Sequence, residues 1–174
     1  MDVLETFTFI GSIFIVVYLF IMQPHQVSGR SMDNTFHDKQ LILTSKITYR
    51  FREPERGDVV VFNSPTNPDI DYIKRVIGLP GDKVRINNGE VFVNGIQLQE
   101  SYINPESKTY GGTFLREGTE VEVPPQFLFV MGDNRAHSSD SREFAFIPYR
   151  DVDGEVFFRY FPLDKIGSIT NPYR

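Results

Sequence analysis

The sequence of 174 residues contains no cysteine and no tryptophan. The absence of cysteine excludes disulfide bonds, thiolate metal ligands and a thiol nucleophile. Basic residues are in the minority, because 18 lysines and arginines stand against 23 acidic residues and the net charge is -5. The chain therefore lacks the dense basic stripe that binds phosphates, and we expect no nucleic-acid partner.

Histidine is scarce as well, and its three copies, His25, His37 and His137, lie far apart. None has the spacing of a metal-binding motif such as H-E-x-x-H, so we expect no metal ion and no other cofactor. Hydrophobic residues make up 40% of the chain. That content is enough for one folded domain of ordinary size.

Only one long apolar run occurs in the sequence, at its N-terminus. Residues 7–22 contain no charged side chain. A helix over them would span about 24 Å, and their flanks can extend it towards the ~30 Å hydrocarbon core of a bilayer. We interpret residues 6–23 as a single transmembrane anchor, preceded by a tail of residues 1–5 and followed by one domain of residues 24–174.

Two alternatives to the anchor stay open, a cleavable signal peptide and a buried core helix. A signal peptide begins with basic residues, whereas this run is preceded by Asp2 and Glu5. The terminal position of the run and its apolar residues on every face argue against a core helix. The nearest basic residues, Arg30 and Lys39, follow the run, so a literal positive-inside count puts the domain in the cytoplasm, on weak evidence.

Beyond residue 41, short β-branched and aromatic runs alternate with turn residues, a pattern typical of a mainly β domain. The pairs Asn88-Gly89 and Asn94-Gly95 predict a tight meander, because both turns need positive φ angles. Residues 102–118 lose this pattern and indicate a long loop. The expected strands are 59–62, 73–77, 84–86, 90–93, 96–98, 120–123, 126–131 and 155–160.

Ser31 lies in an unusual segment, Val-Ser-Gly-Arg-Ser-Met-Asp-Asn-Thr, at residues 27–35. Gly29 leaves the backbone pliable before the hydroxyl, and Met32 places an apolar side chain after it. This setting suits a nucleophile, and it suits an ordinary turn serine equally well. The G-x-S-x-G and S-x-x-K motifs of other serine hydrolases are absent.

Lys74 stands within a β-branched segment, Tyr-Ile-Lys-Arg-Val-Ile, at residues 72–77. In a strand its side chain shares one face with Tyr72 and Val76. Burial on an apolar face lowers the pKa of an amine, as a lysine general base requires. The alternative is an edge-strand lysine whose ammonium group reaches solvent.

The segment 131–142 follows an expected strand and consists mostly of residues with hydrogen-bonding or charged side chains. Aspartate and arginine can pair there and fix the shape of the loop, while hydroxyl groups can orient a neutral amine. A solvated Asp/Ser turn is the alternative.

The chain resembles the membrane-anchored type I signal peptidases in five segments that occur in the same order. These are the apolar N-terminal run, the Ser31 segment, Arg-Gly-Asp-Val-Val-Val-Phe at 56–62, the Lys74 segment to Asp82 and the segment 132–142. These serine endopeptidases remove signal peptides from exported proteins. The resemblance covers nearly the whole chain. It implies an antiparallel β-sheet catalytic domain with one N-terminal transmembrane helix, held on the extracytoplasmic side of the cell membrane.

The resemblance also implies roles for individual residues. Ser31 matches the nucleophile, Lys74 its general base, and Ser138 the hydroxyl that orients the lysine. The backbone N–H of Ser31 would contribute to the oxyanion hole. The residues that match the supporting charged network are Asp140, Arg142 and Arg75.

Two positions depart from the family pattern. Gly29 stands where some members carry a serine that donates to the oxyanion, so this chain lacks that side-chain donor. Asn34 replaces the usual proline before Thr35, which we expect to loosen a turn without changing the chemistry.

The implied substrate is a preprotein signal peptide, cut after small residues with alanine at the first and third positions before the cut. We expect it to bind as an extended strand along a sheet edge near residues 71–73, with alternate side chains in pockets. The bilayer is the other expected partner, and we expect a monomer. The candidate pocket walls are Met32, Tyr72, Ile73, Val27 and Phe36.

Two other functions stay open. A self-cleaving repressor-type protease could share the Ser/Lys pair, but it would carry a DNA-binding domain or a soluble arm in place of the apolar run. A membrane-tethered β-domain could bind extended peptides without cutting them, but this function leaves Ser31, Lys74 and Ser138 unexplained.

Overall fold

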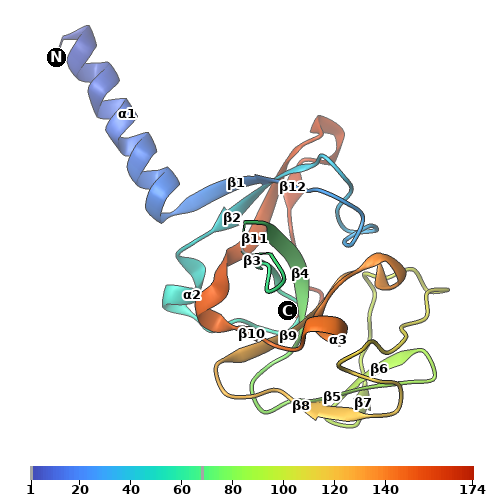
Figure 1. Cartoon of the computed structure of the whole chain (residues 1–174). Helices are drawn as coiled ribbons and strands as arrows, with labels where there is room; N and C mark the ends of the chain where they lie inside the picture. The colour runs from blue at the N-terminus through green and yellow to red at the C-terminus, as the bar shows by residue number, and fades with distance from the viewer. Residues whose placement is uncertain (1, 68) are drawn as a thin grey trace.

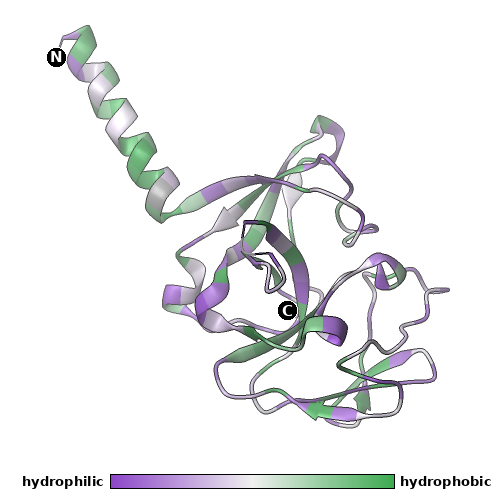
Figure 2. Cartoon of the chain, in the orientation of Figure 1, coloured by the Kyte–Doolittle hydropathy of each residue, from purple (hydrophilic) through white to green (hydrophobic). Residues whose placement is uncertain are grey.

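The computed structural model describes residues 2–67 and 69–174, so Met1 of the predicted tail lies outside the described residues. Helix α1 (Val3–Phe20) projects away from a β-rich body (Figure 1). It consists mostly of hydrophobic residues, with hydrophilic ones at its start (Figure 2). None of the helices within the described ranges reaches both the length and the hydropathy needed to cross a membrane.

The α-helix ends three residues before the predicted boundary at 23. Met22 and Gln23 already belong to strand β1 (Met22–Gln26). The residue before a proline is disfavoured in the α conformation. Pro24 therefore accounts for the extended backbone at Gln23.

The large sheet contains eight antiparallel strands in the order β1-β2-β11-β3-β4-β9-β10, with β12 paired to β11. The other strands of this sheet are β2 (Leu41–Ser45), β3 (Val59–Asn63), β4 (Asp71–Gly78), β9 (Phe127–Met131), β10 (Ile147–Pro148), β11 (Val152–Phe161) and β12 (Gly167–Ser168).

A second sheet lies at the end of the molecule opposite α1 (Figure 1). Its antiparallel order is β7-β6-β5-β8. Asn88 and Asn94 adopt φ angles of 55° and 53° in its two turns, so the predicted meander is confirmed. The strands are β5 (Lys83–Asn87), β6 (Glu90–Val93), β7 (Ile96–Gln97) and β8 (Glu120–Glu122).

Short helical turns and one long loop connect these strands. Residues 98–119 run through turns and bends, as the loss of periodicity over 102–118 predicts. The short helices are α2 (Thr48–Phe51), η1 (Arg135–His137), α3 (Ser141–Phe144), η2 (Tyr149–Asp151) and η3 (Leu163–Lys165).

Strand β3 lies in the middle of the large sheet, and both of its faces are covered by apolar side chains. Val59 and Val61 face one apolar cluster, and Val60 and Phe62 face another. Burial on both faces explains why this strand is a continuous apolar run rather than an alternating one. The mainly β, antiparallel fold predicted from the sequence is confirmed.

Candidate active site

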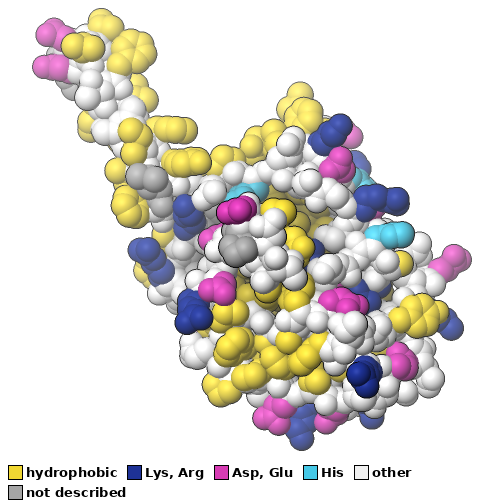
Figure 3. All heavy atoms as spheres, in the orientation of Figure 1, with side chains coloured by type: hydrophobic (Ala, Val, Ile, Leu, Met, Phe, Trp, Pro, Cys, Tyr) yellow, Lys and Arg dark blue, Asp and Glu magenta, His cyan; other side chains and the backbone are white. Residues whose placement is uncertain are grey.

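A groove of about 330 Å³ lies between two walls of the large sheet. The end of β1 with residues 27–31 forms one wall, and the first half of β4 forms the other. Hydrophobic side chains lie at the bottom of a hollow near the middle of the visible face (Figure 3). The apolar residues that line the groove are Val27, Ile42, Val61, Ile70, Tyr72 and Ile73, and the polar ones include His25, Ser28, Arg30, Ser31, Asp71, Lys74, His137 and Ser139.

One edge of β4 is open beside this groove. Strand β3 pairs with β4 over Asp71–Arg75, whereas β9 joins the other edge only from Arg75 onward. Backbone groups of residues 71–74 on that edge are thus left without a strand neighbour. An edge of this kind can pair with an extended peptide.

Lys74 and Ser31 meet in this groove although 43 residues separate them. The Nζ atom of Lys74 donates hydrogen bonds to Ser31 Oγ at 2.8 Å and to the carbonyl oxygen of Ile73 at 3.0 Å. The amine also lies 4.9 Å from the centre of the Tyr72 ring. Tyr72 and Val76 pack in one cluster, as the alternation of the strand predicts.

Burial decides the charge of this amine. Lys74 is only 3% exposed. Desolvation lowers its pKa from 10.5 to about 8, although the carboxylates of Asp140 and Asp133 act in the opposite direction. A substantial fraction of the amine is therefore neutral near pH 8 and can take a proton from the adjacent hydroxyl.

Ser138 lies next to this pair, but its predicted contact is not formed in the structure. Its Oγ atom is buried and has no hydrogen-bond partner among residues 2–67 and 69–174. Gly132 makes room for it: a Cβ atom at position 132 would overlap Ser138 Oγ and the carbonyl oxygen of Ser31. Position 132 thus controls the spacing between the segments that carry Ser31 and Ser138.

A Gly132→Ala substitution is expected to destabilise the fold by about 3 kcal/mol, because the methyl group overlaps backbone as well as a side chain. Urea unfolding measures this change. The matched control is Gly167→Ala, where no atom lies within 4 Å of the added carbon. Equal stabilities for the two variants would contradict the expectation.

Asp140 and Arg142 form an ion pair that shapes the loop after β9. Asp140 accepts from Arg142 at 2.8 and 2.9 Å and from the backbone N–H of Gly132 at 3.0 Å. Arg142 also donates to the carbonyl oxygen of Arg135. The pair thereby connects the loop back to the strand that precedes it.

Arg75 holds a second buried ion pair, with Asp133. Its guanidinium group donates to both carboxylate oxygens at 2.8 and 2.6 Å and to the carbonyl oxygen of Gly57 at 2.9 Å. Both side chains are at most 2% exposed. The pair joins β4 to the loop after β9, immediately beside Lys74.

Four residues of the buried polar networks are not among the predicted site residues: Asp133, Arg135, Glu100 and Thr109. Asp133 belongs to the segment 131–142 that the sequence singles out, and its position beside Gly132 is the available signal. Arg135 pairs with Glu100 and donates to Thr109 at 2.6 Å. No local pattern marks Glu100 or Thr109, because both lie within the long loop of residues 98–119.

The predicted pocket walls are found in two layers. Val27, Tyr72 and Ile73 line the groove. Met32 and Phe36 are 1% and 0% exposed and pack in the apolar cluster behind it.

A free backbone donor lies at the nucleophile itself, because no acceptor among the described residues takes the N–H of Ser31. Gly29 donates to Asp38 at 2.9 Å and has a φ angle of 89°. A Cβ atom at position 29 would have open space around it, but that φ angle strains any residue with a side chain. The backbone conformation thus accounts for glycine here.

Comparison of the sequence with known proteins shows which family the chain belongs to. The model described as "Signal peptidase, peptidase S26" matches residues 1–161. The probable signal peptidase I-2 of Synechocystis sp. is 39% identical over 87% of this chain and 69% of its own length. Signal peptidase I of Bacillus caldolyticus is 38% identical over 86% and 85% of the two chains.

A solved structure supports the same assignment. The crystal structure of a signal peptidase I from Enterococcus faecalis aligns with a TM-score of 0.51 and 31% identity, over 60% of this chain and 97% of that one. The range 1–161 that the family model matches includes the Ser31 segment, the Lys74 segment and the loop after β9. The chain belongs to the signal peptidase I family of serine endopeptidases.

Proposed function

We propose that this signal peptidase cleaves signal peptides from exported preproteins through a Ser31/Lys74 pair, after small residues. The observation that carries this proposal is the 2.8 Å contact between Lys74 Nζ and Ser31 Oγ, combined with burial that lowers the pKa of Lys74 to about 8. The contact sets the geometry of proton transfer. The lowered pKa sets its direction at moderate pH.

In the first step Ser31 Oγ bonds to the scissile carbonyl carbon while its proton passes to neutral Lys74. The N–H of Ser31 stabilises the resulting oxyanion. Lys74 then protonates the departing amine, and the C–N bond breaks to leave an acyl-enzyme. Lys74, neutral again, takes a proton from a water molecule while the water oxygen attacks the carbonyl carbon of the ester. Lys74 then returns this proton to Ser31 Oγ when the acid product leaves.

Neighbouring polar and charged side chains hold Lys74 and Ser31 in position. Ser138, whose hydroxyl lacks a partner among the described residues, orients the Lys74 amine during turnover. The pairs Arg142 with Asp140 and Arg75 with Asp133 hold the loop and β4 in place beside it. They act by position rather than by contact with substrate.

The substrate binds as an extended strand at the open edge of residues 71–74. Alternate side chains then point into the groove, where Val27, Tyr72 and Ile73 leave space for small residues. This arrangement supports alanine at the first and third positions before the cut.

We further propose that α1 anchors the enzyme in the cell membrane, with the β-rich domain on the extracytoplasmic side. The exposed apolar side chains of α1 support this proposal, since Leu4 and Phe7 are 78% and 71% exposed. Apolar surface of this extent is stable in a lipid environment. An anchor also brings the site close to the apolar segment of a signal peptide.

Incubation of the detergent-solubilised protein with a preprotein tests the proposal, with sequencing of any new N-terminus. We expect one cut after a small residue and no cut by a Ser31→Ala variant. Binding without cleavage would instead support the peptide-binding domain. Cleavage of only its own chain would support the self-cleaving protease.

The rate should depend on pH through Lys74. Because the base must be neutral and its pKa is about 8, kcat/KM should rise about tenfold per pH unit up to pH 8 and level off above it. Initial rates on a peptide substrate between pH 6 and 10 measure this profile. A rate that does not change between pH 6 and 8 would exclude a base with this pKa.

A further inference from the structure

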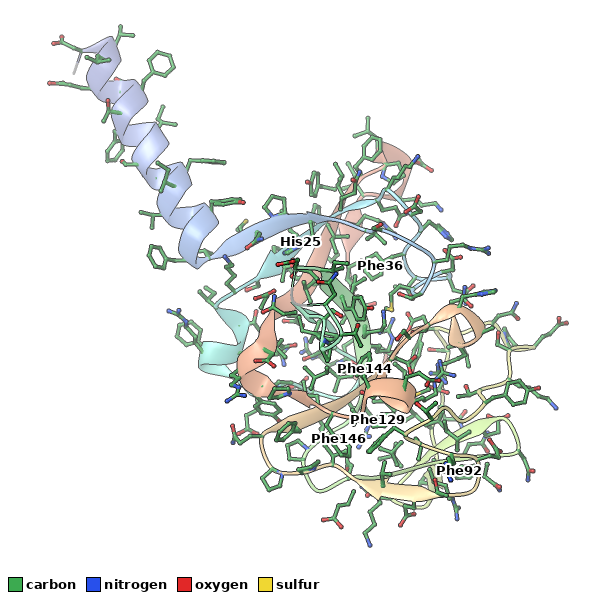
Figure 4. The ribbon with its side chains drawn as sticks, in the orientation of Figure 1. His25, Phe36, Phe92, Phe129, Phe144 and Phe146 are labelled. Atoms are coloured by element: carbon green, nitrogen blue, oxygen red, sulfur yellow. The ribbon has the colours of Figure 1, made fainter. Side chains whose placement is uncertain are left out.

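The end of the groove away from Ser31 is polar. His25 on β1 and Asp71 at the start of β4 face each other across it, with 3.7 Å between His25 Nδ1 and Asp71 Oδ2. Figure 4 shows the His25 side chain pointing from β1 towards the middle of the molecule. Their side chains are 13% and 41% exposed, so the pair is recessed but open to the groove.

Strand spacing relates this pair to the apolar part of the groove. His25 lies two residues before Val27, and Asp71 lies two residues before Ile73. Side chains two residues apart point to the same face and are about 6.6 Å apart, which is also the spacing of alternate side chains in a bound strand. Both walls therefore change from apolar to polar over one step of the substrate.

The hydrogen-bonding capacity of the pair is incompletely used. His25 Nε2 is buried and has no partner within the described ranges, and the 3.7 Å separation from Asp71 exceeds a hydrogen bond. Asp71 Oδ1 accepts from Asn63 at 3.1 Å, which leaves Oδ2 for the groove. A buried polar atom without a partner is costly and gains from a ligand that supplies one.

Burial keeps the His25 imidazole neutral near pH 7, because it lowers the pKa further from 6.5 than the neighbouring carboxylates raise it. Burial lowers its pKa, the carboxylates of Asp71 and Asp153 raise it, and Lys46 lowers it. A neutral imidazole donates one hydrogen bond and accepts another. A hydroxyl group can be the partner in either of these hydrogen bonds, because it both donates and accepts.

The polar end is also the end that faces upstream. Strand β1 begins directly after α1, so the chain approaches His25 from the anchor and Ser31 lies farther along. A signal peptide that leaves the membrane beside α1 meets His25 and Asp71 before the Ser31 hydroxyl. Its third residue before the cut then lies over this pair, with its side chain directed at both residues.

We propose that His25 and Asp71 form a specificity subsite that selects a small hydroxyl-bearing side chain, serine or threonine, at the third position before the cut, over an apolar side chain of the same size. The proposal rests on the proposed function of this groove. Threonine and valine have nearly the same shape, so their comparison isolates the hydroxyl group.

The test uses two forms of one preprotein, with threonine or valine at the third position before the cut. We expect the full-length wild-type enzyme to cleave the threonine form with about fivefold higher kcat/KM, the effect of one hydrogen bond. His25→Phe should reduce this ratio to about one. The matched control is His37→Phe, at a half-exposed histidine that does not line the groove, and this variant should keep the ratio.

The ratio does not depend on how much enzyme is folded, and Asp71→Ala provides a second variant at a partly exposed position that should lower it too. The same threonine/valine exchange at the second position before the cut should have no effect, because that side chain points away. Equal rates for the two forms in wild type, or an unchanged ratio in both variants, would overturn the subsite alone. Failure of wild type to cleave either form would overturn the proposed function and the subsite with it.

Discussion

A Lys74→Met variant should lose cleavage of a preprotein by about 10⁴-fold or more while it folds as the wild type does. Methionine keeps the length of the side chain but removes the proton acceptor for Ser31. Loss of the general base from such a pair costs several orders of magnitude in kcat. Single-turnover assays with excess enzyme measure the remaining rate.

The same variant carries its own control for folding. The pKa of Lys74 is lowered from 10.5 in the unfolded chain to about 8 in the fold, so the buried amine lowers stability below pH 8, and this cost disappears as the pH rises through 10.5. At pH 7 the cost is roughly 3 kcal/mol. The Met variant should thus gain stability relative to wild type at pH 7 and lose that advantage at pH 11.

Two results would contradict this account of Lys74. A Met variant that cleaves at the wild-type rate would remove lysine from the mechanism. A stability difference that stays constant from pH 7 to pH 11 would mean that the amine is not desolvated in the fold.

Asp133→Ala is expected to destabilise the protein by about 3–5 kcal/mol, because it leaves the Arg75 charge buried without its partner. For a chain of this size the midpoint of thermal unfolding should fall by about 10 °C. Activity should fall too, since Arg75 neighbours Lys74 on β4. Scanning calorimetry in detergent measures the shift in midpoint.

An exposed ion pair provides the matched control. Arg150 and Asp151 lie 3.6 Å apart with side chains 87% and 44% exposed, and Asp151→Ala should change stability by less than about 1 kcal/mol. The double variant Arg75→Met, Asp133→Leu should be more stable than Asp133→Ala, because no unpaired charge remains. Equal losses for the buried and exposed single variants would mean that the buried pair has no special role.

Local patterns predicted the elements that form close in sequence. Asn88 and Asn94 marked two tight turns because few residues tolerate their positive φ angles. Alternation within β4 put Lys74 on one face with Tyr72. The predicted anchor extends to residue 23, past the end of α1 at Phe20, because the apolar run continues into β1, where only Pro24 signals the change.

Contacts between distant segments could not be derived from spacing. Arg75 was expected in a charged network, but 58 residues separate it from Asp133. Met32 and Phe36 were expected at the pocket surface, whereas a turn directs them into the layer behind it. Apolar character alone does not distinguish the wall of a groove from its support.

The short open stretch of β4 has a consequence for the folded state of the substrate. Residues 71–74 of β4 pair with β3 on one edge and lack a strand neighbour on the other, and His25 on the opposite wall lies 3.7 Å from Asp71. A strand that already belongs to a sheet brings its own neighbours and does not fit between these walls. Under the proposed binding mode, cleavage is therefore limited to cut sites that are not already held in a sheet, so a strand of a folded protein, including one of another copy of the enzyme, is not cut.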